Sequence, residues 1–369
     1  MRVLITGLST YWGGRLAQDL EKDDDVETII GIDRTPPKVE LERTEFVQVA
    51  DAHSLIRRIV LAAEIDTVID TRLVVDSTVT TPRRAHENNI VGTMNILAAC
   101  SGADSTVRRF VFRSSGLYYG AEQDDPAFFT EEMERPHPPR TRIEKDIVEA
   151  EQLVADFAHS SDDVSVCVLR FAHGLGGGLR TAYTRLLRLP AVPAILGFDP
   201  RWQFVHEDDI VGALEHAARN PDLEGIYNGA ADGVLVLSEI ADLLGKPLAP
   251  LLPPWGTGLA AGALTRLGGI QLPEEMLQHL RYGRGYDNRK LKAAGYRFRY
   301  TTREAVLKLR EAQRIEAIVR PRQEPYRYER EVEEFLRYSP SVRPSARREP
   351  KRQNVARGER RELPEKTRG

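Results

Sequence analysis

The chain begins with a short apolar run that leads into a glycine turn and then a helix-like segment, in the stretch RVLITGLSTYWGGRL. Gly7 permits a tight turn after such a strand, and Gly13 permits close packing of the helix against it. The free N–H groups at the start of the helix are suited to a pyrophosphate. Thr10 stands midway between the glycines, where its Cβ crowds a close approach. The spacing predicts a dinucleotide-binding loop formed by Gly7, Thr10, Trp12 and Gly13.

The first half of the chain alternates between short β-branched runs and longer stretches with the period of a helix. The expected strands are 2–6, 26–32, 46–50, 66–71, 107–113 and 164–170. The expected helices are 12–21, 53–63, 82–101 and 141–159. Strands that alternate with helices indicate βαβ units and a parallel sheet. We therefore predict an α/β fold built on a Rossmann-type, doubly wound parallel sheet.

The pattern changes in the second half, where glycine, proline and short helices dominate. We predict an NAD(P)-binding Rossmann domain over 1–172 and a smaller C-terminal substrate lobe over 173–320, partly interleaved with it. A strong amphipathic helix is expected over 301–319, and a short helical extension over 321–340. Residues 341–369 hold ten Lys/Arg, four Glu and no aromatic residue, which is typical of a disordered basic tail. Further strands are expected near 202–205 and 225–229.

The bulk composition is that of an ordinary enzyme, with 41% hydrophobic and 29% charged residues. A net charge of only -3 gives no reason to expect a nucleic-acid partner. Cys100 and Cys167 lie in apolar runs and are expected to be buried thiols in a reducing compartment. No apolar run approaches the roughly 18 residues that a membrane span needs, and no leader pattern is recognised. We predict a cytoplasmic protein.

The choice of nicotinamide cofactor depends on the end of the second expected strand. Asp33 lies 26 residues after Gly7, near the place of the acidic residue that bonds a ribose hydroxyl of NAD. Arg34 beside it is suited to the 2′-phosphate of NADP. NAD is therefore predicted and NADP stays open. Asp51 and Ala52 follow the third strand, where the adenine of such a cofactor would lie.

Six segments, spread in order over residues 2–310, carry a family resemblance. They are ITGLSTYWGGRL (5–16), ENNIVGTMNILAAC (87–100), VFRSSGLYYG (111–120), VLRFAHGLGGG (168–178), FVHEDDIVGAL (204–214) and YDNRKLKAAGYRFRYTTREAV (286–306). Together they resemble the extended short-chain dehydrogenase/reductase family, whose members include the nucleotide-sugar epimerases and dehydratases. The resemblance implies an NAD cofactor, a nucleotide-sugar substrate and transient hydride transfer on the sugar.

In that family a Ser or Thr, a Tyr, and a Lys four residues after the Tyr carry the chemistry. The lysine holds the nicotinamide ribose and lowers the pKa of the tyrosine, which exchanges a proton with a substrate hydroxyl. The resemblance implies that Ser115 and Lys145 occupy the Ser and Lys positions. Thr141 then occupies the Tyr position, and its hydroxyl is far less acidic than a phenol. As alternatives, Thr141 caps the following helix and Lys145 is a surface residue beside Glu149.

The fourth expected strand ends in VIDTRLVVDS, where the family has a histidine and small residues. Arg72 in this segment is a candidate partner for a cofactor phosphate or an acidic substrate group. Pairing of Arg72 with Asp70 or Asp76 is an equal alternative. His173 replaces an Asn that often touches the substrate in the family. Further candidate substrate residues are Arg201, Arg281 and Arg284. No metal-ligand spacing stands out, so no metal is predicted.

Three functions remain open at this stage. The first is an NAD-dependent nucleotide-sugar epimerase or dehydratase, and the second is a non-catalytic NAD(P)-binding regulator or scaffold that has lost the tyrosine. The third is a reductase or dehydrogenase of an apolar hydroxyl compound, with 250–272 lining the pocket. The resemblance also implies a homodimer through the helices 82–101 and 141–159. Packing of these helices on their own sheet is the alternative.

Overall fold

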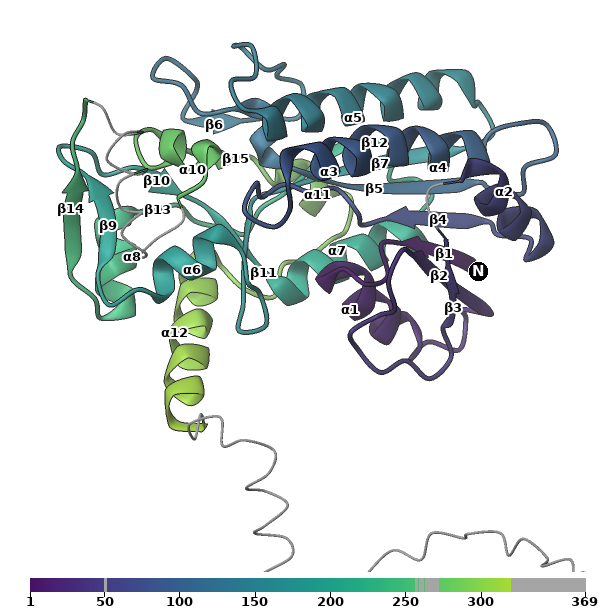
Figure 1. Cartoon of the computed structure of the whole chain (residues 1–369), viewed down its shortest axis with the longest axis horizontal. Coiled ribbons are helices and arrows are strands. Elements are labelled where there is room, and N and C mark those ends of the chain that lie inside the picture. The colour runs from purple at the N-terminus through teal and green to yellow at the C-terminus, as the bar shows by residue number, and fades with distance from the viewer. Residues whose placement is uncertain (50–51, 256–257, 259–261, 263–271, 320–369) are drawn as a thin grey trace, which may run out of the picture. The chain divides into compact units, whose positions relative to one another are not determined.

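The computed structural model describes residues 1–49, 52–255, 258, 262 and 272–319. Its largest element is a seven-stranded sheet in which every neighbouring pair is parallel (Figure 1). The strand order is β12-β7-β5-β4-β1-β2-β3. The strands are β1 (Arg2–Thr6), β2 (Thr28–Asp33), β3 (Glu45–Gln48), β4 (Thr67–Asp70), β5 (Arg109–Ser115), β7 (Ser165–Phe171) and β12 (Gly225–Gly229).

The six strands expected in the first half of the chain are confirmed. The seventh, β12, comes from the second half and pairs with β7, so segments of the lobe return to the main sheet. Strands β1 and β4 are neighbours in the sheet. From β1 the order continues through β2 to β3, and from β4 it continues in the opposite direction through β5 to β7, so the strand order reverses between β1 and β4. Ligands of open parallel sheets bind at such a switch point, beyond the carboxyl ends of the strands.

Helices cover both faces of the sheet, as a doubly wound fold requires (Figure 1). One face packs against α1 (Tyr11–Leu20) and α7 (Glu207–Arg219). The other packs against α2 (His53–Ala62), α4 (Gly92–Cys100) and α5 (Arg142–Ser160). Each face has its own apolar core, because the buried strands are apolar on both sides.

The helix expected over 82–101 is present as a continuous helical run over 82–100 that contains one widened turn. The structure has α3 (Pro82–His86), a π-helical turn at Glu87–Val91, and then α4. In the widened turn the Asn89 side chain accepts from the Val74 N–H at 2.8 Å and donates to the Val74 carbonyl at 2.8 Å. This pair of bonds fixes the segment after β4, which borders the switch point. Single π turns inside helices are frequent at functional sites.

The second half of the chain also builds a smaller mixed lobe with a core of its own. Its four-stranded sheet has the order β13-β10-β15-β6, and two further strand pairs are β11-β8 and β14-β9. These strands are β6 (Phe128–Phe129), β8 (His173–Leu175), β9 (Val192–Ile195), β10 (Arg201–Trp202), β11 (Phe204–His206), β13 (Leu235–Val236), β14 (Leu248–Leu252) and β15 (Gly283–Tyr286). The helices are α6 (Ala182–Arg188), α8 (Leu237–Leu244), α10 (Glu274–His279), α11 (Arg289–Ala293) and α12 (Thr302–Val319).

The amphipathic helix expected over 301–319 is confirmed as α12. Residues Met1–Arg314 form one compact unit, and the predicted boundary at residue 172 stays a prediction. The helical extension over 321–340 and the tail over 341–369 lie outside the described residues. Within the part of the chain that the structure describes, no helix combines the length and apolar character of a membrane span.

Candidate functional site

The loop between β1 and α1 has the geometry of a phosphate-binding turn. Gly7 adopts a φ of +82°, a conformation that favours glycine. Thr10 is the N-cap of α1: its hydroxyl oxygen accepts from the Gly13 N–H at 3.0 Å and donates to the Gly7 carbonyl at 2.7 Å. This bonding explains why a threonine is tolerated between the two glycines. Among the described residues, the N–H groups of Tyr11 and Trp12 have no acceptor, so they are open to a phosphate.

Asp33 closes the loop from the side of β2. Its carboxylate accepts from the Ser9 N–H at 2.9 Å and from the Ser9 hydroxyl at 2.6 Å. Asp33 and the exposed Arg34 border a small cavity of about 30 Å³. Ala52 is exposed at the start of α2, and Asp51 lies outside the described residues.

Arg72 lies across the cleft between the glycine loop and α4. Its Nε and Nη2 bond the two carboxylate oxygens of Asp70 at 3.1 and 2.9 Å, which confirms the pairing with Asp70. A Cβ added at Gly7 would fall 2.6 Å from Arg72 Cγ, and one at Gly92 would fall 2.3 Å from its Nη1. The two glycines therefore make room for this side chain. The residues fit a pyrophosphate at the loop, with the Arg72 guanidinium beside it.

A cavity of about 70 Å³ lies at the carboxyl ends of β5 and β7. Its lining includes Trp12 from the first turn of α1, Ser115 from β5, and Ala172 and His173 after β7. Ser115 is buried, and its hydroxyl oxygen accepts from the Leu117 N–H at 3.2 Å. The structure therefore brings together three predicted site residues, Trp12, Ser115 and His173.

Thr141 and Lys145 do not join this cavity. Thr141 is the N-cap of α5, and its hydroxyl oxygen accepts from the Glu144 N–H at 3.2 Å, so the capping alternative is confirmed. Lys145 is exposed on the outer side of α5, in a groove with His86. The inward positions of α5 hold Ile143 and Ile147, which are buried in the apolar core. The implied placement of a Lys145 amine beside Ser115 is wrong in this structure, because α5 turns that side chain toward solvent.

This geometry predicts the effect of changing the two α5 residues. Thr141→Ala should lower the free energy of unfolding by about 1 kcal/mol through loss of the cap, and Thr141→Ser should restore it. Lys145→Ala should leave both stability and ligand binding unchanged, because the side chain is exposed. Denaturant unfolding of the three variants tests this. A large loss of cofactor affinity in Lys145→Ala would contradict the observed placement of the lysine.

The rings of His173, Tyr183 and His279 pack against one another beside the cavity that Ser115 lines. The rings of His173 and Tyr183 stack with centroids 3.6 Å apart, and His279 meets His173 edge-on at 4.9 Å. Within the described chain, His173 Nε2, Tyr183 Oη and His279 Nε2 have no hydrogen-bond partner. Burial, helped by His279, holds the pKa of His173 well below its usual range, and burial holds the pKa of Tyr183 well above. All of these groups are neutral near pH 7.

The buried His279 also makes stability depend on pH. Burial lowers its pKa from 6.5 to about 4. The unfolded chain therefore binds a proton before the folded chain does, and stability is lost as the pH falls from about 6.5 toward 4. The loss should be on the order of 3 kcal/mol. Thermal unfolding of His279→Phe should show a weaker decline over this range. An unchanged decline in the variant would assign it to other groups.

The three candidate substrate arginines lie elsewhere. Arg201 is exposed on β10, and Arg281 donates to the Pro254 carbonyl at 2.7 Å. Arg284 is buried and pairs with Asp125 at 3.4 Å. None of the three is among the described residues that line the Ser115 cavity, so their role toward a substrate stays a prediction.

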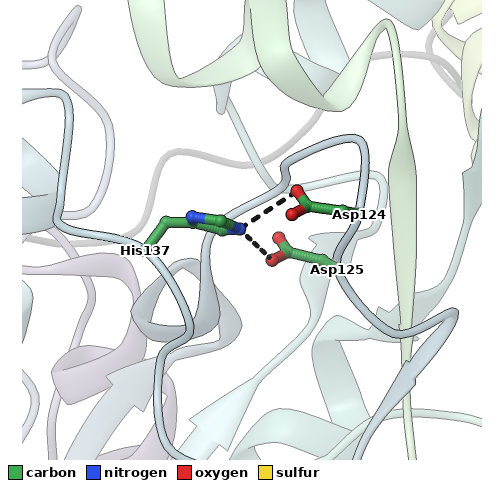
Figure 2. Close-up of side chains that lie close together, drawn as sticks. All are labelled: Asp124, Asp125 and His137. Carbon is green, nitrogen blue, oxygen red and sulfur yellow. Dashed lines mark ion pairs between the residues drawn. The ribbon is translucent and has the colours of Figure 1, made fainter.

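One group of described residues has the spacing of possible metal ligands, although the sequence predicted none. Figure 2 shows the His137 imidazole directed at two carboxylates, with Nε2 3.1 Å from Asp124 and 3.4 Å from Asp125. The Arg284 cation also pairs with Asp125 and opposes a second positive charge there. Three donors are fewer than the four of a structural zinc site. We therefore interpret Asp124, Asp125 and His137 as a group of ion pairs.

Comparison with known proteins decides the family. A model of the NAD dependent epimerase/dehydratase family matches residues 3–229. The chain belongs to this family. The resemblance seen in the sequence is thereby confirmed. An uncharacterized protein of Mycobacterium tuberculosis is 32% identical over 314 residues, which cover 82% of this chain and 81% of that protein.

Solved structures share the fold of this family member. A UDP-glucose 4-epimerase of Thermotoga maritima with UDP-glucose is 20% identical, with a TM-score of 0.64, over 85% of this chain and 99% of that one. A UDP-glucuronic acid 4-epimerase of Bacillus cereus with UDP-glucuronic acid and NAD is 15% identical, also with a TM-score of 0.64, over the same shares. At these identities the likeness concerns the fold.

Arg113 and Tyr183 are among the cavity residues that sequence reasoning missed. Arg113 had a visible signal, because it is a charged residue that directly follows the apolar run FVF of β5. Tyr183 had none, since its place depends on how α6 packs against the segment after β7.

Proposed function

We propose that this protein binds NAD and a nucleotide sugar and acts as an NAD-dependent epimerase or dehydratase of that sugar. The position of Trp12 carries the proposal. Trp12 lies in the first turn of α1, directly after the phosphate-binding turn, and also lines the Ser115 cavity, so the turn and the cavity adjoin each other. A dinucleotide held at the turn would extend toward Ser115, where the sugar would be bound. Asp33 favours NAD, and the neighbouring Arg34 leaves NADP open.

The roles of the residues follow from their contacts. NAD, when bound, supplies the acceptance and return of a hydride. The N–H groups of Tyr11 and Trp12 would hold the pyrophosphate at the helix start. The Ser115 hydroxyl would bond a sugar hydroxyl, and the neutral His173 and Tyr183 would offer further hydrogen-bond partners without charge. These groups orient the sugar and exclude water from the cavity.

A second candidate is a non-catalytic NAD(P)-binding regulator or scaffold. The positions of Thr141 and Lys145 favour it, because neither reaches the cavity. Tyr183 is the one phenol among the described lining residues, and its raised pKa makes it a hydrogen-bond donor rather than a base at neutral pH. The third hypothesis, an apolar-hydroxyl reductase, depends on 250–272, much of which lies outside the described residues.

Turnover separates the first two candidates. The full chain would be incubated with NAD and UDP-glucose or UDP-glucuronate, and the sugar products separated by chromatography. The proposal expects conversion of a nucleotide sugar, and a loss of about 10²-fold or more in Ser115→Ala. Binding of both ligands without any product would support the regulator. Absence of binding would contradict both candidates.

A homodimer and a cytoplasmic location belong to the same proposal. Val91 and Met94 lie three residues apart on the π turn and α4, and are 47% and 51% exposed. Ile90, Leu97 and Ile147, by contrast, are buried against their own sheet. An apolar pair on this outer surface supports pairing of two copies. Gel filtration with light scattering should find a dimer, and Met94→Glu should shift it toward the monomer.

A further inference from the structure

Arg113 is a buried cation that Asp70 attracts from nearby but that makes no ion pair with a described carboxylate. It lies in β5, is 7% exposed and lines the Ser115 cavity. Among the described residues, its side chain makes one hydrogen bond, from Nη1 to the Leu73 carbonyl at 3.0 Å, and the guanidinium lies 5.3 Å from the centre of the Trp12 ring. Burial lowers its pKa to about 10, which leaves it charged at neutral pH. A lone buried charge is costly unless an anion pairs with it.

The open part of Arg113 is the edge that normally holds a carboxylate. In this protein Arg72 and Arg170 each use Nε and Nη2 to bond both oxygens of one buried carboxylate, from Asp70 and Glu151. Among the described residues, Arg113 Nε has no partner, and no bond is made by its Nη2. Arg113 is therefore a buried guanidinium whose Nε and Nη2 edge has no described partner, in a residue that lines a cavity.

The Arg113 guanidinium lies close to the proposed sugar site. Residues two apart on a strand share a face, so Arg113 and Ser115 project from the same side of β5. Both line the same cavity of about 70 Å³.

The carboxylates near this cavity already have hydrogen-bond or ion-pair partners. Asp70 is held by Arg72. Asp76 accepts from the Ala182 N–H at 2.7 Å and from the Thr78 N–H at 2.9 Å. Glu275 accepts from the Ser77 N–H at 2.8 Å, and burial raises its pKa. None of these carboxylates bonds Arg113 among the described contacts, so the guanidinium remains available to a ligand.

We propose that Arg113 binds a carboxylate of the substrate through its Nε and Nη2 edge, so that the substrate is an acidic nucleotide sugar of the uronic acid type. This inference rests on the proposed function, because it assigns the substrate class of the same cavity. The planar fork recognises both carboxylate oxygens and discriminates against a neutral hydroxymethyl group at the same place.

The experiment compares two sugars that differ at one carbon. The NAD-saturated full chain would be titrated calorimetrically with UDP-glucuronate and with UDP-glucose. We expect at least about tenfold tighter binding of UDP-glucuronate by the natural protein. Arg113→Met should lose this preference and bind UDP-glucose as before. Arg58→Met removes an exposed charge from α2 and should keep the preference.

The outcomes separate this inference from the proposed function. Equal binding of the two sugars by the natural protein would overturn the inference alone, as would a preference that survives in Arg113→Met. Failure of both sugars to bind would overturn the proposed function and the inference with it.

A second measurement uses the ligand-free protein. Arg113→Met should unfold at a higher temperature, because a lone buried charge is replaced by an apolar side chain. Acetate should raise the unfolding temperature of the natural protein and not that of the variant. A lower unfolding temperature of the variant would assign Arg113 a structural role instead, and stabilisation by inorganic phosphate but not by acetate would contradict a carboxylate site.

Discussion

Gly13→Ala should destabilise the protein and abolish cofactor binding. A Cβ at this position would fall 2.2 Å from the Gly7 carbonyl oxygen, 2.8 Å from its carbon and 3.0 Å from Leu8 Cα. These are main-chain atoms of the phosphate-binding turn, so no side chain can move aside. We expect a loss of about 3 kcal/mol, which lowers the unfolding temperature by roughly 5–10 °C. The displaced turn would no longer present the N–H groups of Tyr11 and Trp12.

Gly14→Ala is the matched control for this prediction. The nearest atom to its added Cβ is Val39 Cγ2 at 2.9 Å, the end of a side chain that can shift. Alanine is also a better helix former than glycine by up to about 1 kcal/mol. Thermal unfolding should therefore show little change in Gly14→Ala. Equal unfolding temperatures for Gly13→Ala and the natural protein would contradict the tight contact between α1 and the turn.

Glu151→Gln should destabilise the protein at least as much as Gly13→Ala does, because it breaks a buried ion pair. Glu151 on α5 bonds Arg170 on β7 through contacts of 2.6 to 3.1 Å, and both residues are buried. The Ser114 hydroxyl also donates to Glu151, and the Arg170 guanidinium lies 3.4 Å from the centre of the Tyr118 ring. Removal of one charge leaves the other unpaired in the interior. We expect a loss of about 3–5 kcal/mol in the free energy of unfolding.

A double variant distinguishes loss of the pair from loss of packing. In Glu151→Leu with Arg170→Met, both charges are absent and apolar side chains fill the space. The free energy of unfolding of the double variant should regain much of what Glu151→Gln loses, since a buried ion pair often contributes little more than apolar residues of similar volume. Denaturant unfolding measures all variants. A Glu151→Gln protein as stable as the natural one would show that the pair is not desolvated as described.

The parallel sheet and its first loop were predictable because their signals are local. The strand runs are short and β-branched, and the glycines lie at fixed offsets from the first strand. Thr10 looked like an obstacle at the sequence level. The structure shows it as a helix cap that bonds both glycines of the turn, a role consistent with the known preference of threonine for this position.

The rotation of α5 changes the site. Its apolar residues Ile143, Ile147 and Val154 recur at helical spacing and mark the buried side of the helix, which leaves Lys145 outside that stripe. The pairing of Glu151 with Arg170, 19 residues along the chain, ties one face of the helix to β7. With that face inward, Ile143 and Ile147 are buried and Lys145 is exposed. The family spacing that placed Lys145 in the site did not take this apolar stripe into account.

Arg113 and its cavity depend on packing. A charge that directly follows an apolar run is visible in the sequence, but its missing partner is not. Only the folded chain shows that the Asp70 carboxylate is taken by Arg72 and that the Trp12 ring lies beside the guanidinium.

The most direct test of the account is a calorimetric titration of the purified full chain with NAD, NADH, NADP and NADPH. The account predicts micromolar binding of NAD or NADH, weaker binding of the phosphorylated forms, and no detectable binding by Gly13→Ala. A preference for NADP would keep the site but give Arg34 the deciding role over Asp33. Absence of heat with all four compounds, in a protein that unfolds cooperatively, would contradict the central claim that the turn between β1 and α1 holds a dinucleotide.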